Sequence, residues 1–363
     1  MAGSILRTAA FPRAGPLPTI DPFLFVVYHV DEYPADPSGG KMEFLTPGNG
    51  MDFDPSAPYR MYHGDRVPGF PQHPHRGFET ITATVGGLID HADSVGNAGR
   101  YGEGDVQWMT AGKGIVHDEM FPLVNADKPN YLKFFQIWLN LPKANKMVDP
   151  SFAMFWSRDV PVWTSSDGLS TVTVWAGDYF LDEETKQNDP PPDSWAANPD
   201  NDVAVLRIVV KPGGKMVLPK ANKAEEGVNR SLYLVDGLDG IKVNGKIVDS
   251  KVVMTLDATK DISLELPSEA NDDSEFLVLQ GKPIKEPVVQ HGPFVMNTQN
   301  EIRQAFFDYR KTQFGGWPWE RDDMVFPQDK GRFARIDGEE FFPDDSEDQK
   351  EHVDEKKTSD DEL

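Results

Sequence analysis

Two short stretches of the sequence place side chains that could bind a metal ion at matching intervals. "PQHPHRGFET" carries His73 and His75, and "GIVHDEMF" carries His117 and Glu119, so that each pair is two residues apart. In a β-strand, residues i and i+2 project from the same face. If the two stretches form neighbouring strands, three imidazoles and one carboxylate would point into a common pocket.

This set of side chains suits a divalent first-row transition metal. Neutral imidazoles and one carboxylate oxygen would leave two octahedral positions open, as oxygen or a substrate would need. We therefore expect one divalent ion, Fe(2+), although the same donors also accept manganese, cobalt, nickel or copper. The chain has no cysteine, which excludes thiolate ligands, disulfides and thiolate catalysis.

The same strand alternation extends to three further residues. Gly77 and Glu79 would share the face of the first histidine pair, so Gly77 would leave room beside the metal. Glu79 would then either support the ligands or replace one of them. Phe121 shares the face of His117 and Glu119, and we expect it to form an apolar wall of the pocket.

The remaining histidines are interpreted without a metal. A lone histidine is more often a surface or core residue, and one His-x-His pair can arise by chance. We interpret His91 as structural, and His29 and His63 have no partner at ligand spacing. After His117 the chain contains only His291 and His352, so a second three-histidine site cannot form there.

Short apolar runs between glycine-rich turns predict an all-β protein. The chain has 363 residues, with 31 glycines and 30 prolines, and its strand-like runs fall into two groups. Asn244-Gly245 is a strong hairpin signal. Helix is predicted only at 299–311, with Ile302, Ala305, Phe306 and Tyr309 on one face. We expect a first unit at 1–145, a linker at 146–170, a second unit with a closing helix at 171–315, and an extension at 316–363.

Charge limits the partners that the protein can have. The net charge is −23, and residues 338–363 alone contain twelve acids and three lysines, so we expect this tail to be disordered. An acidic field opposes direct nucleic-acid binding, and no apolar stretch is long enough to cross a membrane. We expect a monomer in the cytoplasm or nucleus; a protein partner is left open, and organellar targeting is only weakly indicated. The ending "DDEL" resembles a retention tag, but no secretory signal accompanies it.

Three blocks of the sequence carry a family resemblance. "HPHRGFETIT", "GEGDVQWMTAGKGIVHDEM" and "EPVVQHGPFVMNT" resemble the pirins, a branch of the cupin superfamily, in a match from about Asp21 to Tyr309. The resemblance implies a bicupin of two stacked antiparallel β-barrels, with iron in the N-terminal barrel only. It assigns His73, His75, His117 and Glu119 as the metal ligands.

The resemblance also implies two activities. Some pirins are similar to quercetin 2,3-dioxygenases, in which a flavonol binds the metal and O2 opens its central ring; Glu119 would then be both ligand and catalytic base. The partners would be a small aromatic substrate and O2. The alternative is a metal- and redox-responsive transcriptional coregulator without turnover, which in animal pirins uses a basic surface near the N-terminal arm. Here "AAFPRAGPLPTIDPFLF" has a single arginine, and we favour the dioxygenase. No role is predicted for the Trp317–Trp319 segment.

Overall fold

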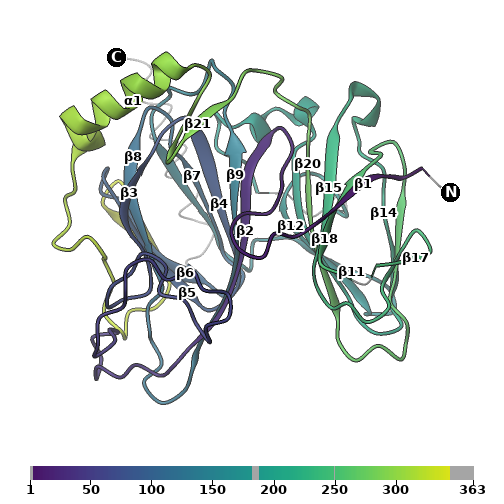
Figure 1. Cartoon of the computed structure of the whole chain (residues 1–363), viewed down its shortest axis with the longest axis horizontal. Helices are drawn as coiled ribbons and strands as arrows, with labels where there is room; N and C mark the ends of the chain where they lie inside the picture. The colour runs from purple at the N-terminus through teal and green to yellow at the C-terminus, as the bar shows by residue number, and fades with distance from the viewer. Residues whose placement is uncertain (1–2, 182–187, 249, 344–363) are drawn as a thin grey trace.

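The protein consists of two β-barrels that lie side by side (Figure 1). A computed structural model describes residues 3–181, 188–248 and 250–343. Its sheets are antiparallel, and the described residues contain one α-helix and four single-turn 3-10 helices. The all-β bicupin architecture expected from the sequence is confirmed. No described helix is long and apolar enough to span a bilayer.

The first barrel closes between a five-stranded and a six-stranded sheet. The five-stranded sheet contains, in spatial order, β10 (Ser151–Phe155), β7 (Val106–Thr110), β4 (Phe78–Gly86), β9 (Asn130–Asn140) and β2 (Phe23–Tyr33). The six-stranded sheet contains β24 (Glu339–Phe341), β23 (Phe333–Ile336), β6 (Ala98–Gly102), β5 (Leu88–Asp93), β8 (Ile115–Met120) and β3 (Gly69–His75).

The second barrel closes between a seven-stranded and a four-stranded sheet. The larger sheet contains β1 (Ile5–Ala10), β18 (Val252–Leu256), β15 (Asn229–Asp236), β20 (Ser274–Gly281), β13 (Ala204–Val210), β12 (Ser170–Ala176) and β11 (Val162–Thr164). The smaller one contains β14 (Lys215–Leu218), β19 (Ile262–Glu265), β16 (Lys242–Val243) and β17 (Lys246–Ile247). Asn244 and Gly245 connect β16 to β17 with positive φ angles of 48° and 75°, as the hairpin signal predicts.

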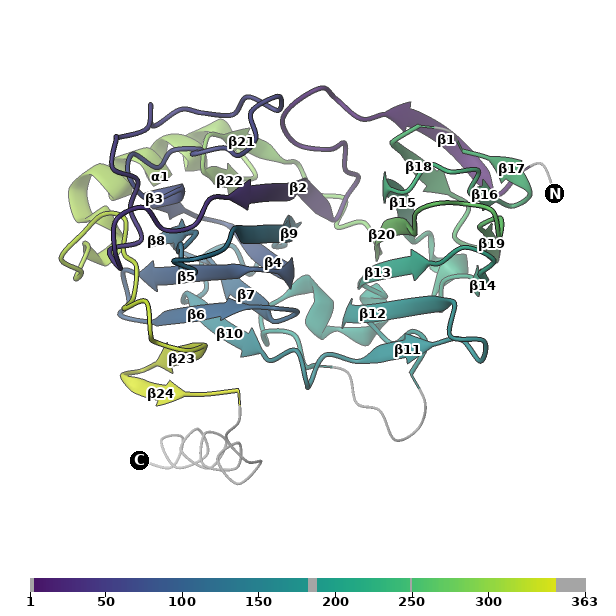
Figure 2. The same ribbon diagram turned by 90° about the horizontal axis from the view of Figure 1, so that it is seen from below.

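Each end of the chain adds strands to the opposite half of the molecule. β1 pairs with β18 of the second barrel, and β23 pairs with β6 of the first (Figure 2). These pairings cross the boundaries expected at residues 145 and 315, and the division into domains stays a prediction. The acidic tail was expected to be disordered from about residue 338, but Glu339–Phe341 form β24; residues 344–363 lie outside the described part.

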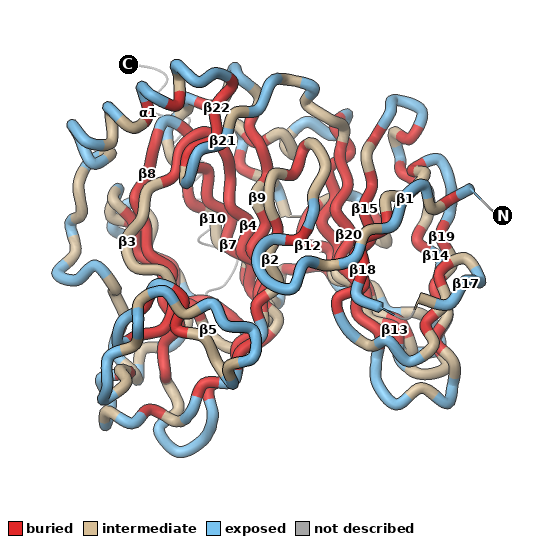
Figure 3. The backbone as a smooth tube through the Cα atoms, viewed as in Figure 1, coloured by how far each residue is buried: buried red, intermediate tan, exposed pale blue. Residues whose placement is uncertain are grey.

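The face between the barrels is apolar, whereas the interior of the first barrel is not. Along β4, Ile81 and Ala83 pack against residues of the second barrel such as Trp175 and Tyr233. Thr82 between them points the other way, into the first barrel, where it contacts Glu119. The second barrel encloses a large aliphatic cluster that includes residues of β13, β15 and β20 (Figure 3). The interior of the first barrel therefore holds a buried carboxylate with a polar neighbour.

The α-helix covers one end of the first barrel together with a short hairpin. α1 (Gln299–Thr312) matches the predicted helix within one residue, and the Thr298 side chain caps it by accepting from the Glu301 amide. Ile302 and Ala305 are buried against the hairpin of β21 (Val289–His291) and β22 (Phe294–Met296). The main chain of this hairpin reaches the first barrel, where the Val295 amide donates to the Arg76 carbonyl at 3.0 Å.

Candidate metal centre

The three predicted histidine ligands lie on two adjacent strands and point toward one another. β3 and β8 pair in antiparallel fashion with His73 directly opposite His117. The ring centroids are 4.8 Å apart for His73 and His75, 4.5 Å for His73 and His117, and 4.9 Å for His75 and His117. One nitrogen from each ring lies within 4.8 Å of the other two. The i, i+2 spacing of His73 and His75 and the pairing of β3 with β8 therefore bring all three imidazoles together.

Hydrogen bonds decide which nitrogen of each ring is free. His73 Nδ1 lies 2.9 Å from the Pro71 carbonyl, and His75 Nδ1 lies 3.4 Å from the Pro293 carbonyl. A carbonyl only accepts, so both Nδ1 atoms carry the proton and both Nε2 atoms keep a lone pair. His117 Nε2 is buried without a hydrogen-bond partner. His73 and His75 thus each offer an Nε2 lone pair, and His117 Nε2, next to them, has no partner among the described residues.

Burial keeps these imidazoles neutral. It lowers the pKa of His73 to about 4 and the pKa values of His75 and His117 well below the ordinary value of 6.5. A neutral imidazole needs to lose no proton before it binds a metal ion. Since an unpaired buried nitrogen costs free energy, the His117 Nε2 atom is best explained by a bound cation. The donors present therefore fit a divalent metal.

Glu119 lies close to this cluster but is not part of it. Its Oε2 atom accepts a hydrogen bond from Gln136 Nε2 at 3.0 Å, and the Thr82 hydroxyl lies 3.0 Å from Oε1. Burial raises the pKa of the Glu119 carboxyl above its ordinary value. Its role as the fourth ligand stays a prediction.

A cavity of about 860 Å³ opens beside the histidines. Its wall includes His73, His75, Glu119 and the predicted Phe121, and it continues toward the N-terminal arm at 11–17 and the second barrel. Besides these polar groups, the wall contains several aromatic rings, namely those of Phe25, Phe70, Phe121, Phe134 and Trp138. Such a volume and lining are typical of a site for a small aromatic molecule.

Two of the predicted pocket residues lie elsewhere. Glu79 was expected near the metal, but its carboxylate accepts hydrogen bonds from Thr110 at 2.8 Å and Ser194 at 2.5 Å. Gly77 was expected to leave room for the ion, but a Cβ there would come within 2.0 Å of the Val295 carbonyl of β22. Gly77 has φ +88°, so the chain turns between β3 and β4 and the strand alternation does not continue through it.

His91 has a place in the site that its interpretation as a structural residue missed. It lies on β5 directly opposite Glu119, and its Nδ1 is 3.4 Å from His117 Nδ1. On the far side its Nε2 is 3.5 Å from the Asp93 carboxylate. If His117 keeps its Nε2 lone pair, its Nδ1 proton points to His91, whose own proton points to Asp93. The i, i+2 spacing of His91 and Asp93 was the available signal.

Comparisons with known proteins agree with this geometry. The family model described as "Pirin" matches residues 9–139, and "Pirin C-terminal cupin domain" matches residues 205–315. A pirin-like protein of Solanum lycopersicum is 36% identical over 67% of this chain and 75% of its own length. Human pirin is 33% identical over 73% of this chain and 84% of its own length.

A solved structure of an enzyme shows the same arrangement of barrels. Quercetin 2,3-dioxygenase from Acinetobacter baumannii superimposes with a TM-score of 0.62 at 26% identity, over 86% of this chain and 96% of the other. Sequence and structure thus point to the same relatives. The chain belongs to the pirin family, with its histidine cluster in the N-terminal of two cupin domains.

Proposed function

We propose that this protein is an iron-dependent dioxygenase of the pirin type, which opens a flavonol-like aromatic substrate with O2. The observation that carries the proposal is the convergence of three neutral imidazoles, two of which, His73 and His75, lie in the wall of a cavity lined by aromatic rings. The similarity to a quercetin 2,3-dioxygenase supports a flavonol-like substrate. His73, His75 and His117 would hold the ion, and Glu119 would be the fourth ligand.

A bound Fe(2+) would supply a Lewis acid and open positions for the substrate oxygen and O2. The protein's own part begins with Glu119, whose carboxylate would accept the proton of the flavonol hydroxyl. Burial raises the pKa of this carboxyl and makes it a stronger base than an exposed glutamate. Gln136 and Thr82 hold the carboxylate in place against the cavity wall.

The aromatic lining would position the substrate and keep water out. Phe70 lies 6.1 Å from Phe121 in an edge-to-face arrangement, and Phe121 lies 5.5 Å from Phe134. These rings are fixed by one another, so they present a preformed apolar surface to a planar ligand. A dry wall protects the deprotonated flavonol from reprotonation by solvent.

The direct test is turnover of quercetin by the iron-loaded protein in air. We expect loss of the flavonol absorbance with release of one equivalent of carbon monoxide. His75→Ala should abolish the reaction because it removes one of the three nitrogens, whereas His291→Ala should not, since His291 is exposed on β21. The proposal fails if the wild-type rate does not exceed that of His75→Ala. Iron binding without turnover would instead favour the metal-responsive coregulator.

Elemental analysis of the purified protein tests the choice of metal. We expect iron in a one-to-one ratio with the chain, lost in His75→Ala and retained in His291→Ala. Reconstitution of the metal-free protein with iron, manganese, cobalt, nickel or copper then shows which ion supports the reaction, because all of them accept these donors. Turnover with any of the other ions, together with no turnover with iron, would overturn the assignment of Fe(2+).

A further inference from the structure

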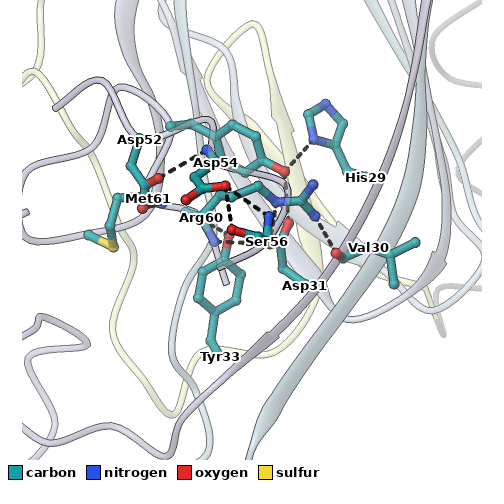
Figure 4. Close-up of polar contacts among 10 residues, drawn as sticks. His29, Val30, Asp31, Tyr33, Asp52, Asp54, Ser56, Arg60 and Met61 are labelled. Atoms are coloured by element: carbon teal, nitrogen blue, oxygen red, sulfur yellow. Dashed lines mark hydrogen bonds and ion pairs between the residues drawn. The ribbon is translucent and has the colours of Figure 1, made fainter. Parts of the chain in front are cut away.

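A second polar group faces the cavity at a distance from the metal centre. His29 on β2 lines the cavity and is only 5% exposed. Its Nδ1 atom lies 2.7 Å from the Tyr62 hydroxyl, which lies 2.7 Å from the Asp31 carboxylate. Figure 4 labels His29, Asp31 and Arg60 of this group. Arg60 completes the group, because its Nε donates to the same carboxylate at 2.8 Å.

This chain of contacts decides the tautomer of His29. Asp31 is a carboxylate that accepts from the Arg60 amide, the Arg60 side chain and the Tyr62 hydroxyl. Because the single Tyr62 proton goes to Asp31, the Tyr62 oxygen must accept from His29 Nδ1. His29 therefore carries its proton on Nδ1, and its Nε2 atom keeps a lone pair.

The lone pair of Nε2 has no partner within the described part of the chain. Among the described residues, the side chain of His29 hydrogen-bonds only to Tyr62, through Nδ1. Nε2 does not belong to the unpartnered polar atoms that the protein buries completely. Nε2 therefore faces the cavity that His29 lines. Burial lowers the pKa of His29 to about 3, so the ring is a neutral acceptor at neutral pH.

Aromatic rings surround His29 on the side of the metal centre. Its ring stacks on Phe134 with centroids 4.4 Å apart and planes 14° apart. The Phe70 ring lies 6.1 Å from His29 and 6.3 Å from His73, so a single phenyl ring separates the two imidazoles along the wall. A flat molecule that reaches the metal centre and extends along these rings would bring its far end to His29.

We propose that His29 is a substrate-binding residue whose Nε2 accepts a hydrogen bond from a hydroxyl at the end of a planar polyphenol that is remote from the metal centre. The inference takes the class of substrate from the proposed function. It adds that the cavity selects, within that class, the molecules that carry a remote hydroxyl. A ligand without a remote hydroxyl leaves a buried acceptor unpaired, and such a loss discriminates more strongly than an added methylene.

The test compares two flavonols that share the metal-binding end. Quercetin carries hydroxyls on its remote rings, whereas 3-hydroxyflavone has none. Their dissociation constants for the iron-loaded protein are measured under nitrogen by fluorescence quenching, so that no turnover is required. His29→Phe should weaken quercetin binding roughly tenfold, the value of one hydrogen bond, and change 3-hydroxyflavone binding less than about twofold.

Further variants separate this effect from a loss of fold. Tyr62→Phe leaves His29 in place but removes the acceptor that keeps its proton on Nδ1. We therefore expect quercetin to bind about threefold more weakly and 3-hydroxyflavone to bind as before. His29→Gln keeps an acceptor and should recover part of the affinity, and His291→Phe, on the exposed hairpin, should match the wild type. Iron content and melting temperature are recorded for each variant.

Two results would overturn the inference, and neither depends on catalysis. The first is equal weakening of both flavonols in His29→Phe, or no weakening of either, and the second is failure of quercetin to bind the wild-type protein. If quercetin binds with the expected selectivity but is not consumed in air, the role of His29 stands and the proposed dioxygenase reaction falls. If quercetin is consumed but His29→Phe shows no selectivity, the reaction stands and the role of His29 falls.

Discussion

Replacing His91 tests whether the residue behind His117 contributes to metal binding. His91 and His117 are both fully buried, with ring centroids 5.3 Å apart, and the contact joins their Nδ1 atoms at 3.4 Å. In His91→Phe the His117 Nδ1 proton would lose its acceptor. His117 could then shift its proton to Nε2, the nitrogen that faces His73 and His75, and a protonated nitrogen cannot bind a metal ion.

The expected magnitude follows from the lengths of the contacts. Loss of a partner behind a histidine ligand typically lowers metal affinity about 10- to 100-fold, or about 1.4 to 2.7 kcal/mol. The two contacts of His91 are long, at 3.4 Å to His117 and 3.5 Å to Asp93, which indicates weak hydrogen bonds. We therefore expect the lower end of that range, a loss of roughly tenfold.

A chelator competition titration measures this difference. Wild type, His91→Phe and His91→Gln are loaded with the same ion and titrated with one chelator. Phenylalanine should be tolerated because His91 already packs against the Phe152 ring at 5.1 Å, and glutamine keeps an acceptor and should lose less. A melting temperature near that of the metal-free wild type shows that the barrel is intact. An unchanged affinity in a folded His91→Phe would refute the reasoning.

Three other predictions concern stability. Lys146→Met should cost about 3 kcal/mol in urea unfolding, because the buried ammonium donates to three acceptors, two of them backbone carbonyls, that would lose their partner. Burial lowers the pKa of His29 to about 3, so below pH 6.5 the unfolded chain takes up a proton that the folded chain refuses. The free energy of unfolding should therefore decrease as the pH is lowered. Between about pH 6 and pH 4, this decrease should be smaller in His29→Phe by roughly 1.4 kcal/mol per pH unit. Adding a chelator should lower the melting temperature of the wild type. If the free metal concentration was 100 times Kd, the loss of stability should be about 2.7 kcal/mol, and the melting temperature of His75→Ala should not change.

Local patterns in the sequence predicted the elements that depend on local rules. The i, i+2 spacing of His73 and His75 identified a strand, because alternation is a property of any extended backbone. Asn244-Gly245 formed the expected hairpin, since both residues tolerate positive φ. The helix starting at Gln299 followed from its apolar periodicity.

Features that depend on distant parts of the chain were not predictable in this way. The alternation failed at Gly77 because β22, more than 200 residues later, approaches its backbone and requires a glycine at the turn. The role of the extension was also hidden. The Trp319 indole donates to the Asp93 carbonyl at 2.7 Å, and the buried Arg100 guanidinium binds carbonyls of the extension as well as Asp90. Neither partner could be found without the fold.

The difference between the two barrels shows what the site would need besides its three histidines. In the first barrel, Glu119 is buried beside Thr82 and accepts a hydrogen bond from Gln136, which offsets part of the cost of removing the carboxylate from water. In the second barrel, strands β13 and β15 fill the interior with side chains such as Ile208 and Leu232. A carboxylate or imidazole placed among these aliphatic side chains would lack such partners, and its burial would cost free energy. The polar lining of the first barrel would therefore support metal binding together with the histidines.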